Sequence, residues 1–264
     1  MEKEIVVITG AGAGIGRELA ELYHKKQHTV IGLDIDPKGK ENFPGSFFTV
    51  DMTHEEELLK TAQKFKEEIG KPTLWINNAG IASLGPFEKI SSDAFRRVMS
   101  VNFDGTVNGT RTALSIMKNP IRGTIVNISS LNGTIPAPFM SSYVSSKHAV
   151  MGFTRSLQEE FAQTQSPLKI LLVSPGFVKT KIMESHPDYN FPDWLNFMVE
   201  DPKKTAQEIY SGISKEKAEI RPTFHGKLLL GLYRVSPTLV KKSSRLLLAK
   251  NWKELFGLSP IKKS

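Results

Sequence analysis

The chain has 264 residues, a net charge of +8 and no cysteine. The absence of cysteine excludes disulfides, thiolate metal sites and a cysteine nucleophile, and the scattered histidines predict no metal site. No linker, repeat or low-complexity tract divides the sequence, which predicts a single domain. The N-terminus does not resemble a signal peptide and no apolar run is long enough to span a membrane, so we expect a soluble, cytoplasmic protein.

A glycine-rich turn follows the first predicted strand, Ile5–Ile8, and leads into a helix predicted over 17–26. Gly10, Gly14 and Gly16 permit a tight turn and a close approach of the backbone to a ligand. The helix then presents free N–H groups and the positive end of its dipole, which suit a pyrophosphate. This succession of strand, turn and helix predicts a dinucleotide site.

An acidic residue, Asp34, ends the second predicted strand, Thr29–Asp34, about twenty residues beyond the glycines. A carboxylate here accepts hydrogen bonds from the adenosine ribose and repels a 2′-phosphate, which favours NAD(H) and leaves NADP(H) as the alternative cofactor. Asp36 is the competing acid, but it precedes Pro37 and is more typical of a turn. Arg17 is a counter-signal, because it lies close to the phosphates although not at the strand end.

The next two predicted strands, 46–50 and 73–76, end in residues suited to a flat ligand. Asp51 and Met52 follow the first of them, where an adenine ring would lie. The second runs into Asn77-Asn78-Ala79-Gly80. The two small residues of this run let the backbone approach a ring system, and the two asparagines are expected to brace adjoining strands.

Helices are predicted over 55–69 and 91–117 from their apolar periodicity. Asn102 lies midway along the second, between apolar neighbours such as Val101 and Phe103. A polar side chain in this position is either a satisfied core amide or part of a site, and the sequence by itself favours the core.

Ser130 follows a strand predicted over 124–128, and Tyr143 and Lys147 lie four residues apart near the start of a helix predicted over 140–161. Side chains at this spacing share one face of a helix, and strand ends and helix starts meet at the carboxyl edge of a parallel sheet. A lysine ammonium favours the tyrosine phenolate, which suits proton transfer to or from an alcohol or carbonyl oxygen. The competing interpretation is a chance pair on a helix surface.

A further strand, predicted over 168–173, leads into the loop 174–180. Residues 181–200 contain many large apolar side chains interrupted by prolines, which predicts a mobile lid over an apolar, bulky substrate. The alternative is that these side chains pack on the body. Asp201 is predicted to cap the next helix, with Pro202 at its first position.

The C-terminal region, 221–264, holds ten of the basic residues and a single acid, Glu254. One helical stripe is predicted there, followed by a second helix that Ser236 caps; the stripe comprises Leu228, Leu229, Leu232 and Val235. A basic amphipathic helix binds an anionic membrane surface or covers its own body with its charges in water. No nucleic-acid recognition motif is present.

Taken together, these motifs resemble those of short-chain dehydrogenase/reductases in order and spacing, over about residues 4–220. The motifs that carry the resemblance are Thr9-Gly-x-x-x-Gly-x-Gly16, Asn77-Asn-Ala-Gly80, Asn102, Ser130, Tyr143-x-x-x-Lys147 and Pro175-Gly176 through Thr180. The resemblance implies an α/β fold with a Rossmann-type doubly wound parallel sheet. It implies one dinucleotide-binding and catalytic domain, 1–220, with a C-terminal helical extension, 221–264.

The resemblance also implies a catalytic tetrad. Tyr143 would be the acid/base, Ser130 would orient the substrate oxygen, and Asn102 would anchor a proton-relay water. Lys147 would bind the nicotinamide ribose and lower the tyrosine pKa, while backbone atoms of Val178 and the Thr180 hydroxyl would donate to the carboxamide. The implied cofactor-binding residues are Gly10, Gly12, Gly14, Ile15, Gly16, Asp34, Asp51, Met52, Asn78, Ala79, Gly80, Tyr143, Lys147, Pro175, Gly176, Val178 and Thr180.

We therefore expect an NAD(H)-dependent oxidoreductase that interconverts a secondary alcohol and a ketone, with an apolar substrate of lipid, acyl or steroid-like type. The family resemblance implies a homo-dimer or tetramer, and the basic tail adds a peripheral membrane contact as an alternative location. A non-catalytic dinucleotide-binding sensor is the rival interpretation. An epimerase on a related fold would need a larger substrate domain, and the absence of Gly-x-Ser-x-Gly excludes a serine hydrolase of that motif.

Overall fold

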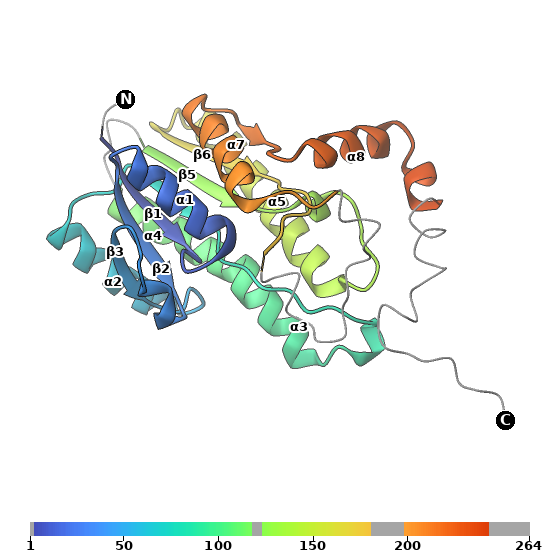
Figure 1. Ribbon diagram of the computed structural model, residues 1–264, viewed down its shortest axis with the longest axis horizontal. Helices are drawn as coiled ribbons and strands as arrows, with labels where there is room; N and C mark the ends of the chain where they lie inside the picture. The colour runs from blue at the N-terminus through green and yellow to red at the C-terminus, as the bar shows by residue number, and fades with distance from the viewer. Residues whose placement is uncertain (1–2, 118–122, 181–197, 243–264) are drawn as a thin grey trace.

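A computed structural model of the protein describes residues 3–117, 123–180 and 198–242 (Figure 1). Seven strands form one sheet in the order β3-β2-β1-β4-β5-β6-β7, and every neighbouring pair is parallel. The strands are β1 (Ile5–Thr9), β2 (Thr29–Asp34), β3 (Ser46–Thr49), β4 (Leu74–Asn77), β5 (Gly123–Ile128), β6 (Leu168–Val173) and β7 (Glu219–Ile220). The strand order reverses between β1 and β4, where such sheets bind their ligands.

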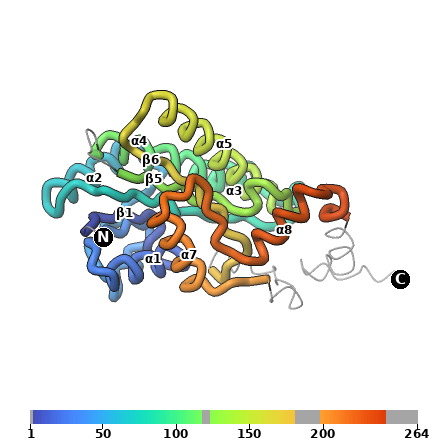
Figure 2. The backbone as a smooth tube through the Cα atoms, turned by 90° about the horizontal axis from the view of Figure 1, so that it is seen from above, coloured from blue at the N-terminus to red at the C-terminus, as the bar shows by residue number. Residues whose placement is uncertain are grey.

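Helices cover both faces of the sheet (Figure 2). They are α1 (Gly14–Lys25), α2 (Glu55–Glu68), α3 (Ser92–Met99), α4 (Gly105–Ile116), α5 (Ser141–Gln163), α7 (Pro202–Ser214) and α8 (Phe224–Val235), with the short turns η1 (Pro37–Lys40), η2 (Phe87–Lys89), η3 (Ser100–Asp104) and η4 (Leu131–Gly133). α1 and α7 pack on one face, and α2, α4 and α5 on the other. The structure thus confirms the predicted Rossmann-type, doubly wound single domain.

Alternation along the strands supplies apolar side chains to both layers. Val6 and Ile8 of β1 face the core under α1 and α7, whereas Val7, between them, faces the core under α2 and α4. A strand that is buried on both faces reads as a continuous apolar run, which is why Ile5–Ile8 could be recognised from the sequence.

The predicted helices and strands agree with the structure to within three residues at their ends, with one interruption and one omission. The helix predicted over 91–117 contains the π-turn η3, which separates α3 from α4 and carries Asn102. β7 was missed, because two residues are too few to show periodicity. The cap on α7 is confirmed: the carboxylate of Asp201 accepts from Lys203 N at 2.8 Å and Lys204 N at 3.1 Å.

In the C-terminal region, α8 packs on the body, where Leu230 forms a hydrophobic cluster with Leu131 and Ile135. The residues of the predicted stripe do not all face the same way. Leu229 is partly buried on the side of α8 that packs on the body, whereas Leu228 is exposed. A second helix begins at Pro237, as predicted. Residues 181–197, which make up most of the predicted lid, and 243–264 lie outside the described residues. Within the described ranges, no helix is long and apolar enough to cross a membrane.

Candidate active site

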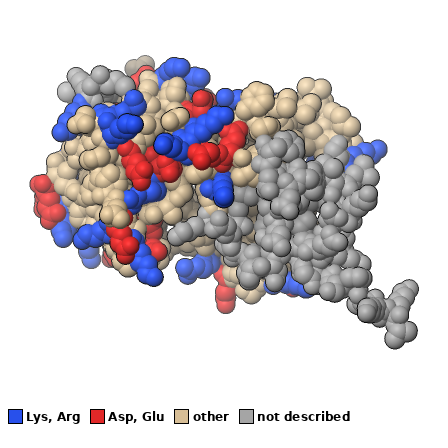
Figure 3. All heavy atoms as spheres, in the orientation of Figure 1, with Lys and Arg blue, Asp and Glu red and all other residues tan. Residues whose placement is uncertain are grey.

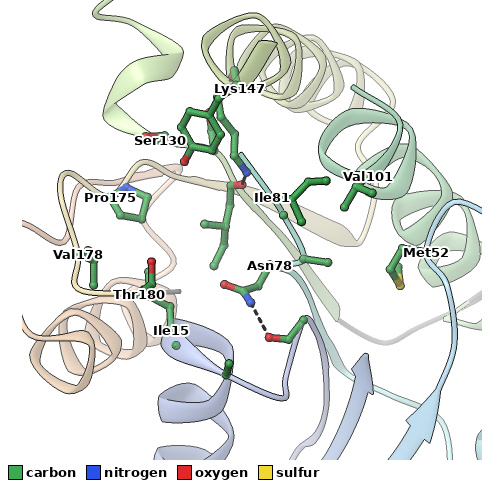
Figure 4. Close-up of a pocket in the computed structure, with 18 of the residues that line it drawn as sticks. Ile15, Met52, Asn78, Ile81, Val101, Ser130, Lys147, Pro175, Val178 and Thr180 are labelled. Atoms are coloured by element: carbon green, nitrogen blue, oxygen red, sulfur yellow. Dashed lines mark hydrogen bonds between the residues drawn. The ribbon is translucent and has the colours of Figure 1, made fainter. Parts of the chain in front are cut away.

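A cleft opens at the carboxyl edge of the sheet, where the strand order reverses (Figure 4). Its lining combines the turn after β1, the ends of β2 and β3, the segment after β4, the turn after β5, the start of α5 and the loop after β6. Most of the predicted site residues meet there: Gly10, Gly14, Ile15, Asp34, Asp51, Met52, Asn78, Ala79, Gly80, Ser130, Tyr143, Lys147, Pro175, Gly176, Val178 and Thr180.

The turn after β1 requires glycine at two of these positions. Gly10 and Gly14 have φ angles of 62° and 55°, which side chains disfavour, and a Cβ on Gly10 would lie 2.8 Å from Ala79 Cα. α1 starts at Gly14 without a side-chain cap on its Ala13 N-cap and without an acid in its first turn. Its first N–H groups therefore remain available to an anion at the cleft, which fits the pyrophosphate of a dinucleotide.

The asparagine that follows β4 fixes this turn. Asn78 Nδ2 donates to Thr9 O at 3.0 Å and to Gly10 O at 3.1 Å. Figure 4 draws one hydrogen bond from this side chain to the glycine-rich turn. In return, Thr9 Oγ1 accepts from the backbone N–H groups of Asn78 and Ala79, both at 3.0 Å. Asn77 Nδ2 donates to Asn127 Oδ1 of β5 at 2.8 Å, so the predicted bracing of neighbouring strands is confirmed for both asparagines. The Asn78 bonds place the small residues after β4 against the glycine-rich turn.

Gly12 and Gly16 lie behind the cleft and do not line it. Gly12 N donates to Asp34 Oδ2 at 2.8 Å, and a Cβ on Gly16 would approach Gly10 O to 2.2 Å. Both positions therefore support the turn through close packing. Their predicted contact with a cofactor stays a prediction.

Two acids compete for the ribose position, and the structure gives them different surroundings. Asp34 lines the cleft, and its oxygens accept from Gly12 N and, at 3.0 Å, from Asp36 N. Asp36 instead caps η1, where its Oδ1 accepts from Lys38 N at 3.0 Å. Asp34 is thus the carboxylate held at the cleft, and Asp36 is a turn residue, as the sequence indicated.

Arg17, the cation that could have favoured a 2′-phosphate, is occupied elsewhere. Its guanidinium donates to the carbonyl oxygens of Gly39 at 3.3 Å, of Glu41 at 3.3 Å and of Asn42, and its Nε pairs with Glu21. These bonds hold the segment after η1 in place. Arg17 is not among the residues that line the cleft.

Ser130, Tyr143 and Lys147 meet at the end of the cleft nearest α5. Figure 4 labels Ser130 and Lys147 at this end. All three side chains are buried, and Ser130 hydrogen-bonds to the Tyr143 hydroxyl. Lys147 Nζ lies 5.8 Å from the centroid of the tyrosine ring and donates to Ile128 O at 3.0 Å. The arrangement places one hydroxyl donor and one ammonium beside a phenol that faces the cleft.

Burial dominates the ionisation of this group. It raises the pKa of Tyr143 above 10.0, and the Ser130 hydrogen bond opposes this shift without overcoming it. It also lowers the pKa of Lys147 from 10.5 to about 8. The expected lowering of the Tyr143 pKa is therefore not found, because removal from water outweighs the Ser130 hydrogen bond.

Asn102 is a satisfied core amide. Its Oδ1 accepts from Ile81 N at 2.7 Å, and its Nδ2 donates to Ile81 O and to Ser146 Oγ, both at 2.9 Å. The side chain lies behind Gly80, where an added Cβ would stand 3.2 Å from Asn102 Oδ1 and 3.4 Å from Lys147 Nζ. Asn102 thus borders the lysine without lining the cleft, and its role in holding a water remains a prediction.

Two distant residues hold the loop after β6. Gly176 N donates to Thr223 Oγ1 at 2.9 Å, and Thr223 is 1% exposed. Glu200 forms a bridge with this loop, since its N–H donates to Phe177 O at 2.9 Å and its carbonyl accepts from Lys179 N at 3.1 Å. Sequence reasoning missed both residues because no local pattern connects them with the loop.

We expect Thr223→Val to raise the dissociation constant of NADH about ten-fold, because Gly176 N would lose its acceptor while the side-chain volume stays the same. Thr223→Ser keeps the hydroxyl and should bind NADH nearly as well as the wild-type protein. Fluorescence titration measures both constants, and thermal unfolding without ligand reports any general loss of structure. Equal NADH binding by the valine and serine variants would contradict a positioning role.

The cleft also contains residues that the sequence analysis did not single out. At the end near Tyr143 they are mostly apolar, with one amide: Ile81, Val101, Leu131, Asn132, Met140 and Phe177. Ile81 and Asn132 lie within two residues of predicted motifs, so proximity in the chain was the available signal. The others are about as near: Val101 adjoins Asn102, Leu131 adjoins Ser130, Phe177 lies within 175–180, and Met140 is three residues before Tyr143.

Comparisons with known proteins agree with this geometry. The sequence profile of the short chain dehydrogenase family matches residues 4–190. Estradiol 17-beta-dehydrogenase 11 of Mus musculus is 30% identical over 244 residues, which cover 89% of this chain and 80% of that protein. The 3-ketodihydrosphingosine reductase of Bacteroides thetaiotaomicron is 32% identical over 181 residues, 68% of this chain and 66% of that protein.

A solved structure supports the fold. It is a short-chain dehydrogenase/reductase from Burkholderia phymatum, with a TM-score of 0.79 and 23% identity, and the match covers 90% of this chain and 95% of that one. The family, which binds a nicotinamide dinucleotide, is shown by the profile match and by the relatives together. The chain is therefore a member of the short-chain dehydrogenase/reductase family, an oxidoreductase acting on CH–OH and C=O groups.

Proposed function

We propose that this protein interconverts a secondary alcohol and a ketone with NAD(H), and that Tyr143 is the acid/base. The observation that carries the proposal is the meeting of Ser130, Tyr143 and Lys147 at one end of a cleft that also contains Asp34. When bound, the nicotinamide dinucleotide supplies or accepts the hydride. The residues of the chain supply placement and proton transfer.

In this proposal the Tyr143 hydroxyl gives its proton to the substrate oxygen during ketone reduction and takes one during alcohol oxidation. Ser130 donates a hydrogen bond to that oxygen and holds it beside the phenol. Lys147 carries a positive charge below its pKa of about 8 and favours the phenolate when the proton leaves. A high Tyr143 pKa keeps the phenol protonated at neutral pH, which suits the reductive direction.

Asp34 supports a preference for NAD(H), with NADP(H) as the alternative. A carboxylate at this place repels a 2′-phosphate, and Arg17 is committed to backbone carbonyls. Among the described residues that line the cleft, Arg97 and Lys147 are the only ones with positive charge. Neither of them belongs to the segment after β2 that would face the adenosine ribose.

We expect Asp34→Asn to shift the ratio of kcat/KM for NADPH and NADH at least ten-fold towards NADPH, because the amide keeps the shape but not the charge. Asp36→Asn is the matched control. It changes a neighbouring carboxylate that caps η1, and the cofactor ratio should stay near that of the wild-type protein. An unchanged ratio in Asp34→Asn would remove this residue from the account of cofactor choice.

Two observations support a substrate class: the apolar side chains that line the cleft and the names of two relatives. Apolar side chains surround the Tyr143 end of the cleft, among them Leu131 and Met140. The relatives carry names that refer to a steroid and to a sphingoid ketone. We infer an apolar substrate of lipid, acyl or steroid-like type, which burial of its hydrocarbon would bind.

The test is a steady-state assay of NADH oxidation with aliphatic, acyl and steroid-like ketones. We expect turnover that rises with the apolar surface of the ketone. NADH binding without turnover of any ketone or of the corresponding alcohols would favour the rival function, a dinucleotide-binding sensor on the same fold.

We also infer a cytoplasmic homo-dimer or tetramer, assembled through α3, α4 and α5, and a membrane contact by the basic C-terminal extension. Family resemblance supports the assembly and the charge of the extension supports the membrane contact. Light scattering of the full chain measures the subunit number. No nucleic-acid partner is expected.

A further inference from the structure

α8 has two different faces. Its inner face packs on the turn after Ser130: Leu230 is 4% exposed there and contacts Leu131 and Ile135. Its outer face is apolar and exposed, and consists of Phe224 (65%), Leu228 (55%), Leu232 (50%) and Val235 (87%). These residues recur every three or four positions and therefore share one side of the helix. We call them the outer face of α8.

Most of the exposed large apolar side chains lie on this face or next to it. Seven large apolar side chains are exposed among the described residues, and five of them lie on α8 or, as Leu239 does, on the helix that follows. α8 lies beyond the carboxyl edge of the sheet (Figure 1), and the space-filling view shows a mostly tan surface over it, with Lys or Arg spheres at its edge (Figure 3). Apolar side chains gathered in this way mark a contact surface.

The charges around the face identify its partner. No acid occurs in the sequence between Arg221 and Lys242, and Lys227 and Arg234 are exposed on α8. Two acids of the body interact with this helix: Glu200 accepts from Phe224 N, and Glu219 attracts Arg234. An apolar stripe bordered by cations fits the interface of an anionic bilayer, where hydrocarbon meets phosphate. A second copy of the chain on the same face would bring like charges together, which opposes self-association.

The position of α8 connects this surface to the site. The inner face of α8 packs on η4, which follows Ser130. Thr223, the residue before α8, accepts a hydrogen bond from Gly176 N in the loop after β6. Glu200 Oε1 also accepts from Phe224 N at 2.6 Å. One helix therefore separates the outer face from the end of the cleft that holds Tyr143.

We propose that the outer face of α8 lies in the headgroup region of an anionic membrane, and that an apolar substrate reaches the cleft from that side. The second part rests on the proposed function, whereas membrane binding does not. The two are separated by measuring binding to vesicles without turnover and activity with a ketone dispersed without vesicles.

The experiment is co-sedimentation of the full chain with vesicles of phosphatidylcholine alone or with about one-third phosphatidylglycerol. We expect binding to the anionic vesicles, loss of binding at high salt, and little binding to the neutral ones. Leu228→Gln/Leu232→Gln should weaken binding at least ten-fold. Lys227→Gln should weaken it about five-fold. The matched control is Phe87→Gln, which changes an exposed apolar side chain on η2 and should bind like the wild-type chain.

All of the variants replace exposed side chains, so activity with the dispersed ketone should stay near the wild-type value and serves as the test of folding. Absence of binding by the wild-type chain, or equal binding by Leu228→Gln/Leu232→Gln, would overturn the proposal. A fall in subunit number by light scattering in that variant would also overturn it, since the face would then be a contact between subunits. If Tyr143→Phe loses NADH turnover but binds vesicles like the wild-type chain, membrane binding is supported independently of the proposed function.

Discussion

Replacing Tyr143 by phenylalanine is expected to lower kcat about a thousand-fold, within the range found for general acid–base groups. The phenylalanine ring retains the packing of the buried tyrosine and loses only the hydroxyl that faces Ser130. The dissociation constant for NADH should therefore stay within about two-fold of the wild-type value. Stopped-flow measurement of a single turnover, with fluorescence titration of NADH, separates the chemical step from binding.

The matched control is Tyr23→Phe. Tyr23 is buried between α1 and α7, and its hydroxyl has no hydrogen-bond partner among the described residues. Removing that hydroxyl should leave kcat unchanged and should not destabilise the protein, since no bond is lost. Near-normal turnover of Tyr143→Phe, equal to that of Tyr23→Phe, would mean that another group transfers the proton.

Lys147→Met is expected to lower kcat about a hundred-fold and, at the same time, to increase the free energy of unfolding at pH 7. The activity falls because the phenolate of Tyr143 loses the neighbouring ammonium. Stability rises because burial lowers the Lys147 pKa from 10.5 to about 8, which corresponds to a cost of about 3 kcal/mol for keeping the charge buried. The lost hydrogen bond to Ile128 O offsets about 1 kcal/mol of this gain.

The gain in the free energy of unfolding of Lys147→Met is expected to depend on pH. Between about pH 8 and 10.5 the unfolded chain binds the Lys147 proton more strongly than the folded chain, so the wild-type free energy of unfolding gains a rising contribution with pH in that window. The methionine variant lacks this contribution, and its advantage should shrink above pH 8. Denaturant unfolding at pH 7 and pH 10 measures it.

Lys64→Met, on the exposed side of α2, is the control for loss of a charge and should change neither property. A Lys147→Met variant less stable than the wild-type protein at pH 7 would show that Lys147 is not buried as a charge. For the wild-type protein we also expect kcat/KM for ketone reduction to fall as the pH rises above about 8, because the Lys147 ammonium loses its proton there.

The sheet and most of the cleft were predictable because their signals are local. Buried parallel strands read as short apolar runs, and a turn that needs left-handed glycines must show them in the sequence, as Gly10 and Gly14 do. The spacing of Tyr143 and Lys147 places both on one side of α5. Knowledge that parallel strands end at a common edge then brought Ser130 to them.

What could not be predicted depends on contacts between distant segments. The direction of the Tyr143 pKa shift follows from burial, which no spacing reveals, so the expected lowering of this pKa was wrong. The assistance of Lys147 to the phenolate stays a prediction. Thr223 reaches Gly176 across 47 positions in the chain. On α8, the split between Leu229 and Leu228 depends on which side of the helix meets η4.

The central claim is that the phenol of Tyr143 moves the proton while hydride moves between NADH and a carbonyl carbon. The direct measurement is mass spectrometry of the alcohol formed from an apolar ketone and NADH that carries deuterium at both C4 positions. The account predicts one deuterium on the carbinol carbon of the wild-type product, and about a thousand-fold less labelled product per unit time with Tyr143→Phe. An unlabelled alcohol, or equal labelling rates for the two proteins, would contradict it.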